Sequence, residues 1–121
     1  MTDLDPVKDF YDSRLQNMWL TLPCMQVYVR KATHLHPLTK EPLWCFDIAN
    51  IHVNEANRCS GTFTAWLNGV IVFAAERGFD AIHIENVLTD RFANYFRRDC
   101  RWIETSHAIP SFFHIFPKES T

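Results

Sequence analysis

The segment of residues 44–53 restricts the possible folds more than any other part of the chain. Its apolar side chains fall on both faces of an extended strand: Cys45, Ala49, Ile51 and Val53 alternate with Trp44, Phe46 and Ile48. A strand of this kind needs cover on both sides, because either face would otherwise expose apolar surface to water. We therefore predict that residues 44–53 form a central strand of a sheet.

The segments before this strand predict a helix, a strand and a loop. Asp5 followed by Pro6 is a typical helix start, and Val7, Tyr11, Leu15 and Met18 would line one face of an amphipathic helix. Residues 25–29 suit a strand. Residues 34–42 contain two prolines and several polar residues, which predicts a loop or a broad turn.

The segments after the central strand alternate between helix and strand. A polar loop over 54–60 leads at Gly61 into a helical apolar pattern that stops at Gly78. Residues 80–87 alternate as a strand, and Thr89 can cap a helix whose inner face holds Phe92, Ala93 and Phe96. Residues 101–106 and 111–116 predict an antiparallel hairpin. We therefore predict a fold of the broad α/β group, of the α+β class, with a mixed, mostly antiparallel sheet flanked by helices.

Composition limits the number of domains and the partners. A chain of 121 residues with 47% hydrophobic content suits one domain over 1–121. The net charge of -2 gives no general attraction to phosphate backbones, so we expect neither a nucleic-acid nor a membrane partner. The acidic start, the short apolar runs and four cysteines without CxxC spacing predict a cytoplasmic protein with reduced thiols.

Three stretches of the sequence resemble one known family. They are IHVNEANRCSGTFTAWL (residues 51–67), RGFDAIHIENV (77–87) and RFANYFRRDCRW (91–102). In order and content they resemble the GNAT superfamily of acyl-CoA-dependent N-acetyltransferases. That pattern is a strand, a pyrophosphate loop, a helix, a strand, a helix with a Tyr and a final hairpin. The loop motif begins with Gln or Arg, has a Gly three residues later, and has a Gly or Ala two residues after that Gly. Arg58 and Gly61 match the loop.

The resemblance implies a GNAT-like sheet that binds acetyl-CoA (coenzyme A). The strand backbone would pair with the pantetheine arm, and the loop would wrap the pyrophosphate ahead of the helix. The residues assigned to the cofactor are Ile51, His52, Val53, Arg58, Cys59, Ser60, Gly61, Thr62, Phe63 and Asn86. Phe63 stands where the family has a small residue, so we expect its ring to point away into the core.

The resemblance also implies direct acetyl transfer to an amine of a small molecule or a protein. An ammonium with a pKa near ~10.4 must first lose a proton, which requires a base. Asp47 is the first candidate, because apolar neighbours would raise its pKa, and Glu85 is the second. A family tyrosine often protonates the departing thiolate; Phe96 falls on that position in the natural register, and Tyr95 is next to it. Either carboxylate could instead be held in a salt bridge.

Five other interpretations are compatible with the sequence. Residues His34, His36, Cys45, His52 and Cys59 form the only zinc-like set, although they lack short paired spacing. Arg91, Arg97, Arg98 and Arg101 could make a basic patch, and Cys59 could be a nucleophile at a helix start. A GNAT-like scaffold could bind a protein or nucleic acid without catalysis. Aromatic residues such as Phe112 or Phe116, if exposed, could pair two copies as a homodimer.

Overall fold

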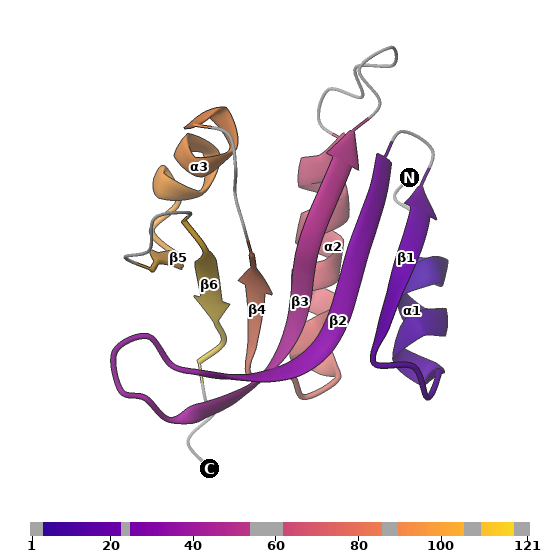
Figure 1. Ribbon diagram of the computed structural model, residues 1–121, viewed down its shortest axis with the longest axis horizontal. Coiled ribbons are helices and arrows are strands. Elements are labelled where there is room, and N and C mark those ends of the chain that lie inside the picture. The colour runs from indigo at the N-terminus through magenta and orange to yellow at the C-terminus, as the bar shows by residue number, and fades with distance from the viewer. Residues whose placement is uncertain (1–3, 23–24, 54–61, 86–89, 106–109, 118–121) are drawn as a thin grey trace.

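Within the residues that the structure describes, the sheet has six strands, and three helices lie before and between them in the chain. The computed structural model describes residues 4–22, 25–53, 62–85, 90–105 and 110–117. The elements are α1 (Asp5–Asp12), β1 (Asn17–Leu22), β2 (Met25–Leu35), β3 (Pro42–Val53), α2 (Thr62–Glu76), β4 (Ala81–Ile84), α3 (Asp90–Arg97), β5 (Trp102–Glu104) and β6 (Phe112–Ile115). The strand order is β1-β2-β3-β4-β6-β5, and β3–β4 is the parallel pair (Figure 1). The predicted fold class is confirmed.

Helices α1 and α2 cover the same face of the sheet. Figure 1 shows α1 behind β1 and α2 behind β3. The main core lies between these layers, where Phe46, Ile48, Ile82 and Ile84 of the central strands pack against buried residues of the helices. A smaller apolar cluster, which includes Cys45 and Phe113, lies on the opposite face. Strand β3 is therefore covered on both sides, as its composition predicts.

Helix α1 is shorter than its pattern predicts. It ends at Asp12, and Asp5 lies in its first turn while Leu4 occupies the cap position. The Nζ of Lys31 on β2 donates hydrogen bonds to the carbonyl oxygens of Phe10 at 3.2 Å and Ser13 at 2.9 Å. This cation satisfies carbonyls at the negative end of the helix dipole. Residues 17–22 then form β1, a strand that the helical interpretation of Met18 missed.

The hairpin of β2 and β3 is longer than the sequence predicts. Thr33, His34 and Leu35 pair with Trp44, Leu43 and Pro42, so His34 lies in a strand and not in the predicted loop. Figure 1 shows that this end of the hairpin curves across the lower ends of β4 and β6. The curvature brings the His34 ring to 6.1 Å from the Phe113 ring of β6. A residue of β2 thereby contacts strands that it does not pair with.

A β-bulge interrupts β3 at Ala49. Val29 pairs with Ile48 and Tyr28 pairs with Asn50, which leaves Ala49 as the extra residue. A bulge bends the strand and shifts its alternation by one residue. Ile51 consequently packs against the main core, on the side of Ile48. The prediction that Ile51 faces the side opposite Ile48 is wrong for this reason.

The other boundaries follow local rules. Gly78 has a φ of 85°, its N–H donates to the Ala75 carbonyl, and the Phe79 N–H donates to the Ala74 carbonyl. This is a Schellman stop, and it confirms the predicted end of α2. Residues 102–104 and 112–115 form the predicted antiparallel pair, with β6 inserted between β4 and β5.

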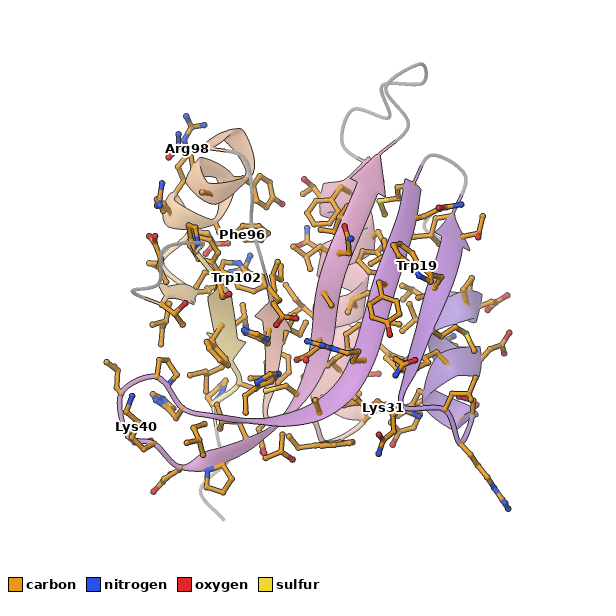
Figure 2. The ribbon with its side chains drawn as sticks, viewed as in Figure 1. Trp19, Lys31, Lys40, Phe96, Arg98 and Trp102 are labelled. Atoms are coloured by element: carbon orange, nitrogen blue, oxygen red, sulfur yellow. The ribbon has the colours of Figure 1, made fainter. Side chains whose placement is uncertain are left out.

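Packing around α3 closes the end of the sheet at β5. Figure 2 shows Phe96 and Trp102 close together, and their ring centroids are 4.9 Å apart. Phe112 is fully buried beside Phe96, and Phe116 is partly buried against the core. Phe112 is therefore not an exposed aromatic for pairing two copies. Within the described residues, no helix has both the length and the apolar character needed to cross a bilayer.

Candidate functional site

Five polar side chains gather on the face of the sheet opposite α1 and α2. We call them the Asp47 cluster: Arg30 and His34 from β2, Asp47 from β3, His83 from β4 and Glu85 just after β4. Asp47 lies at the centre and has no exposed surface. Its Oδ2 accepts from His34 Nε2 at 2.7 Å and from an Arg30 guanidinium N–H at 3.3 Å. Its Oδ1 lies 3.4 Å from His83 Nδ1.

The protonation of Asp47 is set by two opposing effects. Burial on its own would raise the pKa of Asp47, but the hydrogen bond from His34 and the neighbouring imidazole of His83 lower it more, and the net pKa is below the ordinary value. The prediction that apolar neighbours raise this pKa is therefore wrong. Phe46 and Ile48 are adjacent in sequence, yet they face the helices, whereas Asp47 faces the imidazoles. Asp47 is a buried, ionised carboxylate.

His34 and His83 lie against each other over the cluster. Their ring centroids are 4.3 Å apart, and the His83 ring is 4.4 Å from the Phe113 ring. The hydrogen bond to Asp47 raises the pKa of His34, against an opposing effect of burial. His83 has only 6% relative exposure, so it is part of the site and not a surface residue. Neither histidine was among the predicted catalytic residues.

Glu85 and Arg30 form the open side of the cluster. The two side chains make an ion pair, and about a third of each side chain remains exposed, 30% for Glu85 and 32% for Arg30. The Glu85 N–H donates to the Ile48 carbonyl at 3.0 Å. This bond is the last backbone link between β3 and β4 among the described residues. Glu85 therefore stands where the two strands part.

The parting of β3 from β4 leaves a length of strand edge. Their register runs from Cys45–Ala81 to Ile48–Ile84, while β3 continues to Val53 (Figure 1). Within the described residues, the edge of 49–53 on the β4 side has no backbone partner. The bulge at Ala49 stands at the start of this edge. Ile51, His52 and Val53, predicted to meet the cofactor backbone, belong to this edge.

The rest of the predicted cofactor site is only partly described. Arg58, Cys59, Ser60, Gly61 and Asn86 lie outside the described residues. Thr62 is the first residue of α2. Phe63 packs against the main core, with its ring 6.3 Å from that of Trp66 and 6.0 Å from that of Tyr95. The predicted inward orientation of Phe63 is confirmed.

Tyr95 and Phe96 point in different directions from α3. Phe96 is fully buried among Trp102 and Phe112. The Tyr95 hydroxyl donates to Thr64 Oγ1 at 3.0 Å, so it reaches the first turn of α2. Of the two neighbouring residues, Tyr95 is thus the one directed to the helix that follows the open edge.

The other candidate groups are mostly engaged elsewhere. Arg97 pairs with Glu104 and Arg101 pairs with Asp99, and the side chain of Arg91 lies outside the described residues. Arg98 follows the last residue of α3 and is exposed (Figure 2). Burial, with the charge of Asp47, raises the pKa of Cys45 to about 12, so this thiol is unreactive. His36 Nδ1 accepts from the Leu38 and Thr39 amides in the hairpin loop.

No protein-family model matches the chain, and a search of curated proteins gives no match either. Function is therefore inferred from the geometry of the Asp47 cluster and of the strands around it.

Proposed function

We propose that this protein transfers an acetyl group from acetyl-CoA to an amine, as a divergent member of the GNAT superfamily. One observation carries the proposal: β3 parts from β4 after Ile48, beside the Glu85 carboxylate, and the chain then leads into α2. A parted pair of parallel strands offers backbone amides to an extended ligand. Ligands of open sheets commonly bind beyond the carboxyl ends of parallel strands.

Each part of the cofactor has a candidate partner in this arrangement. The open edge of 49–53 would hydrogen-bond the pantetheine arm, and one of its amides would polarise the thioester carbonyl. Loop residues 58–61 and the start of α2 would hold the pyrophosphate, since free amides and the positive end of the dipole meet there. These loop residues enter the proposal through the family resemblance alone.

Glu85 is the better candidate for the base. Both carboxylates pair with Arg30, but Asp47 has no exposed surface and is also bound by His34, whereas the Glu85 side chain is 30% exposed. We assign proton acceptance to Glu85, and to Asp47 the task of holding Arg30 and His34 in place. The amine nitrogen bonds to the acetyl carbon while the carbon–sulfur bond breaks. The amine proton passes to Glu85, and the departing thiolate takes a proton from Tyr95.

The acceptor is an amine of a small molecule or a protein. Cys45 and Cys100 are free thiols, which suits a reducing compartment, and we propose the cytoplasm.

Thermal unfolding with and without acetyl-CoA tests the cofactor part of this proposal. Ligand at about a hundredfold over its dissociation constant adds about 2.7 kcal/mol to the free energy of unfolding. Substituting Gly61→Trp, which would fill the predicted phosphate loop, should abolish that shift. A wild-type chain whose unfolding temperature is unmoved at millimolar acetyl-CoA would overturn the assignment.

Glu85→Gln tests the catalytic part. We expect it to retain the acetyl-CoA shift while the release of free CoA thiol in the presence of a panel of amines falls by about 100-fold or more. Glu104→Gln is the matched control, because Glu104 is also a partly exposed glutamate paired with an arginine, Arg97. Equal rates for wild type and Glu85→Gln would remove Glu85 from the mechanism.

One alternative is supported by specific contacts. Asp47 is held by His34 and Arg30, and the Tyr95 hydroxyl is hydrogen-bonded to Thr64, so both groups would have structural roles in a GNAT-like scaffold that binds a protein or nucleic-acid partner without catalysis. Such a module would give neither an acetyl-CoA shift nor thiol release.

A further inference from the structure

Three side chains of the Asp47 cluster converge as metal ligands do. They are His34 on β2, Asp47 on β3 and His83 on β4, and their ligand atoms all lie within 4.8 Å of one another. Each comes from a different strand of the same sheet, and Asp47 and His83 are buried. Side chains on neighbouring strands are held by the backbone pairing, so the three donors have little freedom to move apart.

The donor types suit a divalent transition metal, and the three donors lie close enough together to reach one ion. Two imidazole nitrogens and one carboxylate oxygen are a common ligand set for Zn²⁺, which accepts His and Asp together. Metal–ligand bonds of about 2.0–2.2 Å place neighbouring tetrahedral ligands ~3.3–3.5 Å apart. The observed pairs are 2.7 Å for His34 Nε2 to Asp47 Oδ2 and 3.4 Å for His83 Nδ1 to Asp47 Oδ1. Small side-chain rotations would open the first pair around an ion.

Two atoms of this set are unsatisfied without such a ligand. Asp47 Oδ1 and His83 Nδ1 are both buried, and neither has a hydrogen-bond partner in the described structure. Buried polar atoms are normally paired, because an unpaired one loses its interaction with water and gains nothing in return. The two atoms face each other, so a cation that binds both would satisfy both.

The guanidinium of Arg30 is the group that opposes a cation here. It bonds to Oδ2 of Asp47 and pairs with Glu85, so its charge is shared between two carboxylates. With both imidazoles neutral, as metal binding requires, the cluster carries two negative charges and one positive charge. Its net charge is therefore negative, which favours a divalent ion.

We propose that His34, Asp47 and His83 bind a divalent transition metal ion of the zinc class. Three protein ligands leave a fourth position for water or another small ligand, the arrangement of catalytic zinc sites. His34 is the most exposed of the three ligands, at 27% of its side chain, whereas Asp47 and His83 are buried. The site does not depend on the acetyl-transfer proposal.

Metal binding to the full chain tests this site directly. After treatment with EDTA, the protein is dialysed against Zn²⁺ and its metal content is measured, and Co²⁺ serves as a spectroscopic probe. We expect about one ion per chain, a rise in unfolding temperature with Zn²⁺, and a Co²⁺ spectrum without a thiolate charge-transfer band. His34→Gln and His83→Gln should each weaken binding by at least about 100-fold.

His36→Gln is the matched control, because His36 is two residues from His34 but accepts amide hydrogen bonds in the loop. It should bind the ion as the wild type does. Circular dichroism establishes that each variant is folded. A folded wild type that takes up no Zn²⁺ or Co²⁺ would overturn the proposal. Binding by His34→Gln and His83→Gln that is as tight as in the wild type would overturn it too. Acetyl-CoA binding is measured separately in EDTA, so either proposal can fail alone.

Discussion

Asp47 holds together groups from three strands, and this position makes it the most consequential single residue. Its carboxylate is fully buried and charged, so His34, His83 and Arg30 are needed to stabilise the charge. Paired buried charges add little net stability, since desolvation offsets their attraction. Removing one partner, however, leaves the others uncompensated. The same residue thus constrains the fold and defines the candidate site.

Asp47→Ala should therefore lower the free energy of unfolding by about 3 kcal/mol, because Arg30 and His34 lose their common partner in a mostly buried setting. Urea unfolding in EDTA measures this without a contribution from bound metal. Glu104→Ala, which breaks the exposed pair with Arg97, should cause a much smaller loss. Similar losses in the two variants would show that Asp47 is not the centre of a coupled network.

At the scale of elements, local patterns predicted most of the chain. Three elements formed as predicted, and each was predicted from a pattern within its own segment. These patterns are the composition of 44–53, the helical spacing before Gly78 and the alternation around Ile82. The failures needed information from other segments. Pairing with Leu43 keeps His34 in β2, and the bulge at Ala49 reverses Ile51. Of the Asp47 cluster, the sequence pointed to Asp47 and Glu85, but the curvature that adds His34 has no local signal.

The link between α1 and β2 provides a test at the same scale. Lys31→Met should cost about 1–2 kcal/mol, because the Phe10 and Ser13 carbonyls lose a charged donor and the Phe10 ring loses a cation 4.7 Å from its centroid. Lys40→Met is the control, since Lys40 lies exposed at the hairpin tip (Figure 2). Thermal unfolding of the two variants decides the matter: equal losses would mean that Lys31 does not cap α1.

For the molecule as a whole, the two faces of the sheet respond oppositely to pH. His34 has a raised pKa, so its contribution to stability is present below about 6.5 and is lost as the pH rises through the folded-state pKa. His114, on β6, has a lowered pKa, because burial and then the charge of Arg101 disfavour its charged form while Asp99 opposes them. Its contribution to stability is complete above about pH 6.5. It is lost as the pH falls, because the unfolded chain takes up a proton at a higher pH than the folded chain does.

Replacing His114 separates these contributions. The ring of His114 packs edge-on against Trp102 at 5.2 Å, and Phe has a similar shape. His114→Phe removes the group that the unfolded state protonates more readily, so the variant should lose less stability than the wild type between about pH 7 and pH 5. Urea unfolding across that range, in EDTA, measures the difference between the two curves. If the curves stay parallel, burial does not disfavour the charged form of His114 in the folded chain, and the opposite pH response of the two faces is refuted.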